Sequence, residues 1–357
     1  MPNNVSINGR SRCPRCTTTL KARDNFPVLG WLALGGRCRT CKLPISSRYP
    51  IVEASVGMSL ALLGVAELYR LAIPYQWNHW HGGPLWAPVV DGMVIAVLIY
   101  HAVGVACCWA LGLIRIDAVK LPRRLIVFAF AATMVPMLVF PTLMIVPWQT
   151  DRPDGWFPDG LYMDALMRVV TALVAAAVYG RILARGLCPR ANPKLDPLGT
   201  DTARLMDLIA IIAIPSIVVG WQAIAAVIVL ASLIALLLQK TLPGSRDALG
   251  AFALAMPVAL TFQLVLWRRL HFFAYWPSDD SSHWVILFAA GVVLLVPVWL
   301  REPVRPVVPV AVEPPSATDE PSTGEPAADE SAAGDADEIV DDRYADDRYA
   351  DEHSADD

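Results

Sequence analysis

Long apolar stretches separated by short polar loops dominate the chain from residue 51 to residue 300. Most of these stretches approach the roughly 20 residues that an α-helix needs to cross a bilayer. They predict eight membrane helices, near residues 51–69, 89–114, 125–147, 163–184, 205–219, 221–238, 249–267 and 283–300. The fifth and sixth are short and could form one tight hairpin around Gly220-Trp221. The pattern predicts an all-α polytopic membrane protein.

Two polar segments flank the apolar region. Residues 1–50 are basic and contain cysteines, whereas residues 301–357 are rich in Pro, Ala and acids and include the tandem DDRYA-DDRYA of 341–350. A segment with so few apolar residues cannot offset the entropy of ordering, so we expect a disordered acidic tail. It is either a plain solvated extension or a docking motif for a basic partner. The expected domains are 1–50, 51–300 and 301–357.

Charge is divided unevenly along the chain. The formal net charge is −4, but residues 301–357 hold 18 acidic and four basic residues, so the rest of the chain is basic. The cations of that body lie between apolar spans, which suits lipid headgroups rather than nucleic acid. We therefore expect a lipid bilayer as a partner and no nucleic-acid binding.

Loop charges predict the orientation in the membrane. The loops at 115–124 and 185–204 are basic, whereas 70–88 is aromatic and 148–162 is acidic. Because basic loops stay in the cytoplasm, the N-terminal domain, the basic loops and the C-terminus are predicted to be cytoplasmic. Arg268 and Arg269 fall on the predicted outer side and oppose this orientation.

Two Cys-x-x-Cys pairs lie in the N-terminal domain, with 21 residues between them. The four residues are Cys13, Cys16, Cys38 and Cys41. A two-residue gap lets both thiolates of a pair bind one ion, and two such pairs complete a tetrahedral zinc shell. Four sulfurs leave no open position, so the predicted zinc is structural, in a zinc-ribbon-like domain. The alternatives are four reduced structural cysteines or two disulfides.

The same segment carries further motifs, which read CPxC, DN-x-P-V-x-x-W, G-R-C-x-x-C and I-S-x-R-Y-P-x-V-E. Their residues are Asp24, Asn25, Pro27, Trp31, Gly36, Arg37, Arg48, Tyr49, Pro50 and Glu53. This pattern resembles the N-terminal domain of the prepilin (type IV leader) peptidases. The resemblance covers about forty residues, and the rest of the chain is judged separately.

The resemblance implies an activity and a location. Members of that family cleave the leader of type IV pilin-like precursors at the cytoplasmic face of the bacterial inner membrane, for pilus or type II secretion assembly. They use two aspartates, and many also N-methylate the trimmed pilin with S-adenosylmethionine. The sequence contains no separate methyl-donor motif, so the resemblance alone implies that cofactor.

Asp117 is the first candidate for an acid of that kind. It lies just past the second apolar segment and resembles the second acid of the family signature Asp-x-Asp-x-x-x-(Leu/Ile)-Pro-(Asp/Asn), aligned by Leu121-Pro122. The first acid of the signature falls on Arg115. Alternatively, Asp117 is an interfacial acid paired with Arg115 or Lys120.

The second candidate acid is either Asp201 or Asp207. The family pattern Gly-x-Gly-Asp-x-Lys is followed by a Gly-Trp-Gln turn, which Gly220-Trp221-Gln222 resembles. Asp201 keeps a nearby glycine, whereas Asp207 fits the spacing to that turn better. Alternatively, Asp201 caps the fifth helix, and Asp207 gains from the helix dipole in its first turns.

These residues lead to three functional hypotheses. The first is a prepilin peptidase-like aspartic endopeptidase, in which one carboxylate activates water and the other, protonated, polarises the scissile carbonyl. The second is a catalytically degenerate, non-enzymatic relative that binds pilin-like substrates or assembly components. The third is a zinc-ribbon membrane adaptor that acts through its acidic tail.

Overall fold

A computed structural model describes residues 12–13, 16–69, 88, 90–145, 160–191, 199–241, 247–278 and 281–302. The chain divides into two units, residues 1–304 and 305–357, and every described residue belongs to the first. The predicted acidic tail therefore lies outside the described residues from position 303 onward.

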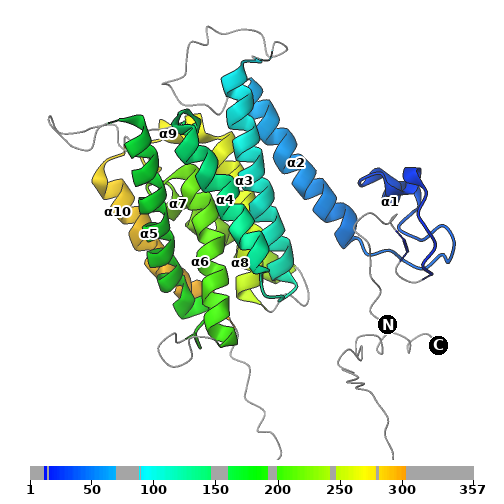
Figure 1. The fold of residues 1–357 in the computed structure, drawn as a ribbon. Coiled ribbons are helices and arrows are strands. Elements are labelled where there is room, and N and C mark those ends of the chain that lie inside the picture. The colour runs from blue at the N-terminus through cyan, green and yellow to red at the C-terminus, as the bar shows by residue number, and fades with distance from the viewer. Residues whose placement is uncertain are drawn as a thin grey trace, which may run out of the picture. The chain divides into compact units, whose positions relative to one another are not determined.

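The described residues are helical and contain no strand (Figure 1). The long helices are α2 (Arg48–Leu68), α3 (Gly92–Ile116), α4 (Arg123–Val139), α5 (Leu161–Leu187), α6 (Thr200–Val219), α7 (Ile224–Thr241), α8 (Ala248–Val265) and α10 (His283–Trp299). The short ones are η1 (Ala22–Asn25), α1 (Leu29–Ala33), η3 (Pro141–Leu143) and α9 (Trp267–His271). Each apolar segment predicted from the sequence contains a helix.

The fifth of these helices differs from its prediction. It begins at Thr200 rather than near residue 205, so α6 is a full 20 residues long. Gly199 is its N-cap, and Asp201 lies in its first turn instead of capping it. At its other end Gly220 has a φ of +88°, a conformation that favours glycine. This residue ends α6, and α7 begins four residues later. The predicted turn at Gly220-Trp221 is therefore present between two separate helices.

Within the described residues, five helices are long and apolar enough to cross a membrane, namely α2, α3, α5, α6 and α8. The helices α7 and α10 are apolar over shorter stretches. These lengths and compositions are those of a polytopic membrane protein.

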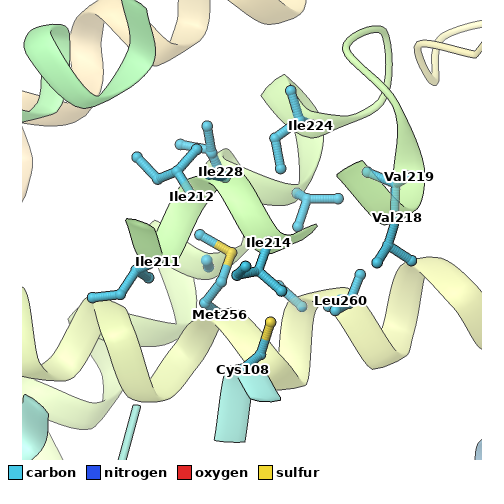
Figure 2. Close-up of a cluster of buried hydrophobic side chains, with 14 of the residues drawn as sticks. Cys108, Ile211, Ile212, Ile214, Val218, Val219, Ile224, Ile228, Met256 and Leu260 are labelled. Carbon is cyan, nitrogen blue, oxygen red and sulfur yellow. The ribbon is translucent and has the colours of Figure 1, made fainter. Parts of the chain in front are cut away.

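Two helices form the centre of the bundle. Over the most apolar 18 residues of α6 and of α8, 78% are buried, compared with 22% in α2. The helix α8 packs against α3 and α7, and α6 packs against α5. Figure 2 shows how Ile214 and Val218 of α6, Met256 and Leu260 of α8 and Cys108 of α3 meet in this core. α2 lies at the edge of the bundle, beside α3 and α8.

Four helix ends meet at one end of the bundle. Arg115 in the last turn of α3 contacts Asp247, the N-cap of α8, and Arg204 near the start of α6 contacts Asp247 and Glu302, which follows α10. We call Arg115, Arg204, Asp247 and Glu302 the ion cluster. The predicted acids Asp117, Asp201 and Asp207 lie on the same helix ends.

Candidate functional site

The two Cys-x-x-Cys pairs form two loops with the same backbone pattern. In the first, Cys13 N–H donates to Thr18 O and Thr17 N–H donates to Cys13 O, at 3.0 and 2.9 Å. In the second, Cys38 N–H donates to Leu43 O and Lys42 N–H donates to Cys38 O, at 2.9 and 3.0 Å. Each loop is bracketed by an isolated β-bridge, and the residue after its second cysteine has a positive φ. The sequence repeat is thus a structural repeat.

The four sulfurs converge on one point. Cys13 Sγ lies 4.0 Å from Cys41 Sγ, Cys16 Sγ lies 3.9 Å from Cys38 Sγ, and all four ligand atoms lie within 4.8 Å of one another. A tetrahedral zinc with Zn–S bonds of about 2.3 Å requires sulfur separations of about 3.8 Å. A disulfide would bring two sulfurs to about 2.05 Å. The cysteines are free, so the alternative of two disulfides is wrong, and the cluster has the geometry to hold zinc.

The thiols of the cluster differ in pKa. A hydrogen bond from the Leu43 backbone lowers the pKa of Cys41, but burial and the contacts with the other three cysteine sulfurs raise it to about 11, whereas the surroundings of Cys16 favour the thiolate form. Thr18 Oγ1 lies 3.4 Å from Cys16 Sγ, and hydrogen bonding from the side chain and backbone of Thr18 lowers the pKa of Cys16 to about 6. Metal ligation by cysteine requires the thiolate, so this contact suits a metal ligand.

Several residues of the recognised motifs hold the loops together. Arg39 forms a two-pronged ion pair with Asp24, at 2.6 and 2.9 Å, and Trp31 Nε1–H donates to Ile45 O at 3.0 Å. Gly36, with a φ of +70°, lies against the Trp31 ring, where an added Cβ would come within 2.8 Å of the ring. These contacts explain why the motif contains an aspartate, a tryptophan and a glycine at these positions.

Glu53 joins the cysteine domain to the bundle. This carboxylate, on the second turn of α2, accepts a 2.8 Å hydrogen bond from Val28 N–H. Val28 has a φ of +58°, which is strained for a β-branched residue. The contact both stabilises that conformation and ties residues before α1 to α2.

Asp117 follows the end of α3 and is half exposed. Its two carboxylate oxygens accept hydrogen bonds from the Arg48 guanidinium, at 2.5 and 2.8 Å. Arg48, the first residue of α2, is therefore its partner, rather than the Arg115 or Lys120 expected from sequence proximity.

Asp207 is buried within the second turn of α6, with 3% of its surface exposed. Its carboxylate accepts a long 3.4 Å hydrogen bond from Leu121 N–H, in the loop between α3 and α4. Arg115, Lys120 and Arg204 are close enough to act on it electrostatically. Asp201 is only half-buried in the first turn. Among the described residues, neither acid forms a hydrogen bond or ion pair with Asp117.

Sequence reasoning missed the ion cluster beside Asp207. Arg115 is 2% exposed, and its Nη2 lies 3.1 Å from Asp247 Oδ2. Arg204 Nη2 lies 3.2 Å from Asp247 Oδ1 and 2.5 Å from Glu302 Oε2. Asp247 also caps α8 by accepting a hydrogen bond from Leu249 N–H. The signal was present, because Asp247 directly precedes an apolar helix on the predicted cytoplasmic side.

Comparisons with known proteins locate a relationship in the N-terminal region. Residues 1–66 match the family model of the Bacterial Peptidase A24 N-terminal domain. No solved structure matches the chain.

Curated proteins match the same part of the chain. A prepilin leader peptidase/N-methyltransferase of Myxococcus xanthus is 54% identical over 70 residues, which are 20% of this chain and 20% of that protein. The enzyme of the same name from Aeromonas hydrophila is 51% identical over 63 residues, 18% and 20% of the two chains. A type 4 prepilin-like proteins leader peptide-processing enzyme of Escherichia coli O78:H11 is 51% identical over 53 residues, 15% and 20% of the two.

The matched segments span about one fifth of the length of these relatives. The resemblance predicted from the sequence is thus confirmed for the region that holds the cysteine cluster and the start of α2. Residues 1–66 of this chain are therefore similar to the N-terminal domain of the bacterial A24 peptidases, and named prepilin leader peptidases share that segment.

Proposed function

We propose that the chain is a prepilin leader peptidase-like endopeptidase that cleaves pilin-like precursors at the cytoplasmic face of the bacterial inner membrane. Two observations support this. The N-terminal domain is about 50% identical to that of named leader peptidases, and a membrane-type helical bundle gathers several carboxylates at one end. The single observation that carries it is the family match of residues 1–66.

The proposed arrangement has three parts, a cytoplasmic domain over 1–50, a membrane domain of eight crossings over 51–300 and an acidic tail over 301–357. The ends joined by the ion cluster are consistent with alternating crossings, since α3 and α10 end there while α6 and α8 begin there. N-methylation with S-adenosylmethionine is a further proposal, which rests on the relatives' printed names.

The reaction needs two acids close together. One carboxylate takes a proton from water as the water attacks the scissile carbonyl carbon, and the other, protonated, donates a hydrogen bond to the carbonyl oxygen. The peptide bond then breaks, and the amine of the product takes up a proton. The candidates are Asp117, Asp201 and Asp207, and Asp247 joins them because it lies with Arg115 and Arg204 in the ion cluster near Asp207.

Single changes of these four aspartates to asparagine test the proposal. Cleavage of a purified pilin-like precursor by the full chain in lipid nanodiscs should fall at least about a hundredfold for the two reacting acids. The other two variants should keep measurable activity. If all four variants cleave as well as the unchanged chain, the aspartic mechanism is wrong.

We also propose that the four cysteines bind one structural zinc ion. The purified full chain should contain about one equivalent of zinc, measured by elemental mass spectrometry. Cys16→Ser should lose it, and Cys108→Ser should keep it, because Cys108 is buried in the helical core away from the cluster. Zinc retained in Cys16→Ser would contradict the assignment.

A specific observation favours a second candidate function, that of a non-enzymatic relative binding pilin-like substrates or assembly components. Arg48 and Arg115 each neutralise a candidate acid, and a nearby guanidinium opposes the proton sharing that an acid pair requires. In that case the unchanged chain leaves the precursor intact but retains it in a pull-down from nanodiscs.

A further inference from the structure

Three polar contacts join α2 to α3 along the whole length of their interface. They are Arg48 to Asp117 at 2.5 and 2.8 Å, Trp109 Nε1–H to Ser59 Oγ at 3.2 Å, and Glu67 Oε1 to His101 Nδ1 at 2.5 Å. We call these three pairs the polar ladder. A step of eight residues up α2, from Ser59 to Glu67, matches a step of eight down α3, from Trp109 to His101. These two pairs therefore share one antiparallel register, and the Arg48–Asp117 pair closes the contact where Asp117 follows the end of α3.

The ladder spans a membrane-sized distance. Arg48 and Glu67 are 19 positions apart on one helix, which corresponds to about 28 Å along its axis. The pairs Ser59–Trp109 and Glu67–His101 are buried, with Glu67 and His101 each 1% exposed and Ser59 7% exposed. Polar groups at such depth are costly unless they are paired. Their pairing therefore fixes which faces of α2 and α3 meet.

Apolar packing of α2 is confined to one face, where Val56, Leu60 and Leu68 are partly buried against the core. Its buried apolar residues are Pro50, Leu63 and Ala66, and most of its remaining surface is open. An added Cβ at Gly57 or Gly64 would meet nothing within 4 Å, so these two glycines do not bring α2 into close contact with a neighbouring helix. In a bilayer, lipid tails compete with apolar side chains for such a surface, and polar contacts gain in relative weight.

The Arg48–Asp117 pair, which we call the inner pair of the ladder, lies near the hydrogen bond that joins the cysteine domain to α2. Arg48 opens α2, and Glu53, one turn further on, accepts the hydrogen bond from Val28 N–H. The register of α2 on α3 therefore sets where the cysteine domain is held. Both carboxylate oxygens of Asp117 accept hydrogen bonds from Arg48 and so help to hold α2 in this register.

We propose that Asp117 is a positioning residue, which with Arg48 forms the inner pair of a polar ladder that fixes α2 and the cysteine domain it carries on the helical bundle. The inference rests on the proposed peptidase function only for its effect on cleavage. It leaves Asp201, Asp207 and Asp247 as the candidates for the two reacting acids.

A charge swap separates positioning from reaction. The variants are Arg48→Asp, Asp117→Arg and the double variant, with Arg124→Asp as the control because Arg124 is an exposed cation at the start of α4, outside the ladder. Amide exchange of residues 44–56, measured by mass spectrometry on the full chain in nanodiscs, reports the docking of α2. Each single variant should exchange about 2- to 5-fold faster, as expected for a half-exposed ion pair. The double variant should regain most of that protection, and the control should match the unchanged chain.

Cleavage of the pilin-like precursor is the second measurement. Positioning predicts that both single variants cleave more slowly and that the swap recovers cleavage together with protection. A swap that regains protection and stays inactive would show that the Asp117 carboxylate reacts, which overturns the proposal. Protection that is unchanged in the single variants, or not regained in the swap, overturns the ladder. If the unchanged chain does not cleave, the proposed function fails and the exchange data alone decide the positioning role.

Discussion

Gly30 leaves no room for a side chain in the cysteine domain. An added Cβ would lie 2.4 Å from Asp24 O, a backbone atom that cannot move without disturbing the Asp24–Arg39 ion pair. Arg115 is the opposite case, a large charged side chain that is 2% exposed, with Nε and Nη1 buried and without a hydrogen-bond partner among the described residues. The cysteine domain thus depends on the absence of a side chain at Gly30, and the ion cluster depends on the buried charge of Arg115.

Gly30→Ala should weaken zinc retention by about tenfold or more, because overpacking costs about 1–3 kcal/mol and folding of such domains is coupled to the metal. Competition with a chromophoric chelator measures it on the full chain. Gly57→Ala is the matched control, since nothing lies within 4 Å of its added Cβ. Equal zinc retention in both variants would mean that the contact at Gly30 relaxes freely.

Arg115→Met should destabilise the bundle by about 1–3 kcal/mol, because it removes a buried partner of the Asp247 carboxylate. The loss is less than for an isolated buried charge, since Asp247 keeps Arg204. Thermal unfolding in detergent, followed by tryptophan fluorescence, measures the change. Arg123→Met, at an exposed site, should unfold like the unchanged chain, and an equal shift in both variants would argue against a buried ion cluster.

The helices α3 and α8 approach closely through glycines on both sides. An added Cβ at Gly112 of α3 would lie 2.6 Å from Ala253 O, and one at Gly250 of α8 would lie 3.0 Å from Ile116 Cα. Small residues at such crossings let two membrane helices pack backbone to backbone. This packing contrasts with that of α2 on α3, where polar pairs add to the apolar contact of Leu63 and no glycine of α2 is in close contact. The helix α3 therefore packs against α8 through glycines and is joined to α2 by polar pairs.

Gly112→Ala should lower the unfolding temperature measurably, corresponding to about 1–3 kcal/mol, because the Ala253 carbonyl is backbone and cannot step aside. Gly291→Ala in α10 should leave it unchanged or raise it slightly, since that position is open and alanine favours the helix. Comparable unfolding temperatures for the two variants would refute the close crossing.

For the whole molecule, the sequence was informative where local pattern determines structure. Apolar length located each long helix, and the Cys-x-x-Cys repeat located a cluster of four cysteines that could hold a metal ion. The ion cluster and the polar ladder were not predictable in this way, because their partners are far apart in sequence. Arg48 meets Asp117 across 69 positions and Arg204 meets Glu302 across 98. Hydrophobic periodicity contains no information about which charged side chains face each other across a packed bundle.

Removing the metal should unfold the cysteine domain and leave the bundle intact. Among the described residues before α2, only the nine residues of η1 and α1 are helical, and the loops come together at the four cysteines. Far-ultraviolet circular dichroism should therefore change little on chelation, while amide exchange of residues 16–47 rises sharply. A large loss of helix on chelation would indicate that the bundle also depends on the metal.

The most direct test of the central claim is the mass analysis of a purified pilin-like precursor after incubation with the zinc-loaded full chain in nanodiscs. The account predicts two products, a leader and a shortened pilin, whose masses add up to that of the precursor plus one water. Precursor that stays intact with the unchanged chain, while its α2 remains docked by amide exchange, would contradict the assignment as a leader peptidase.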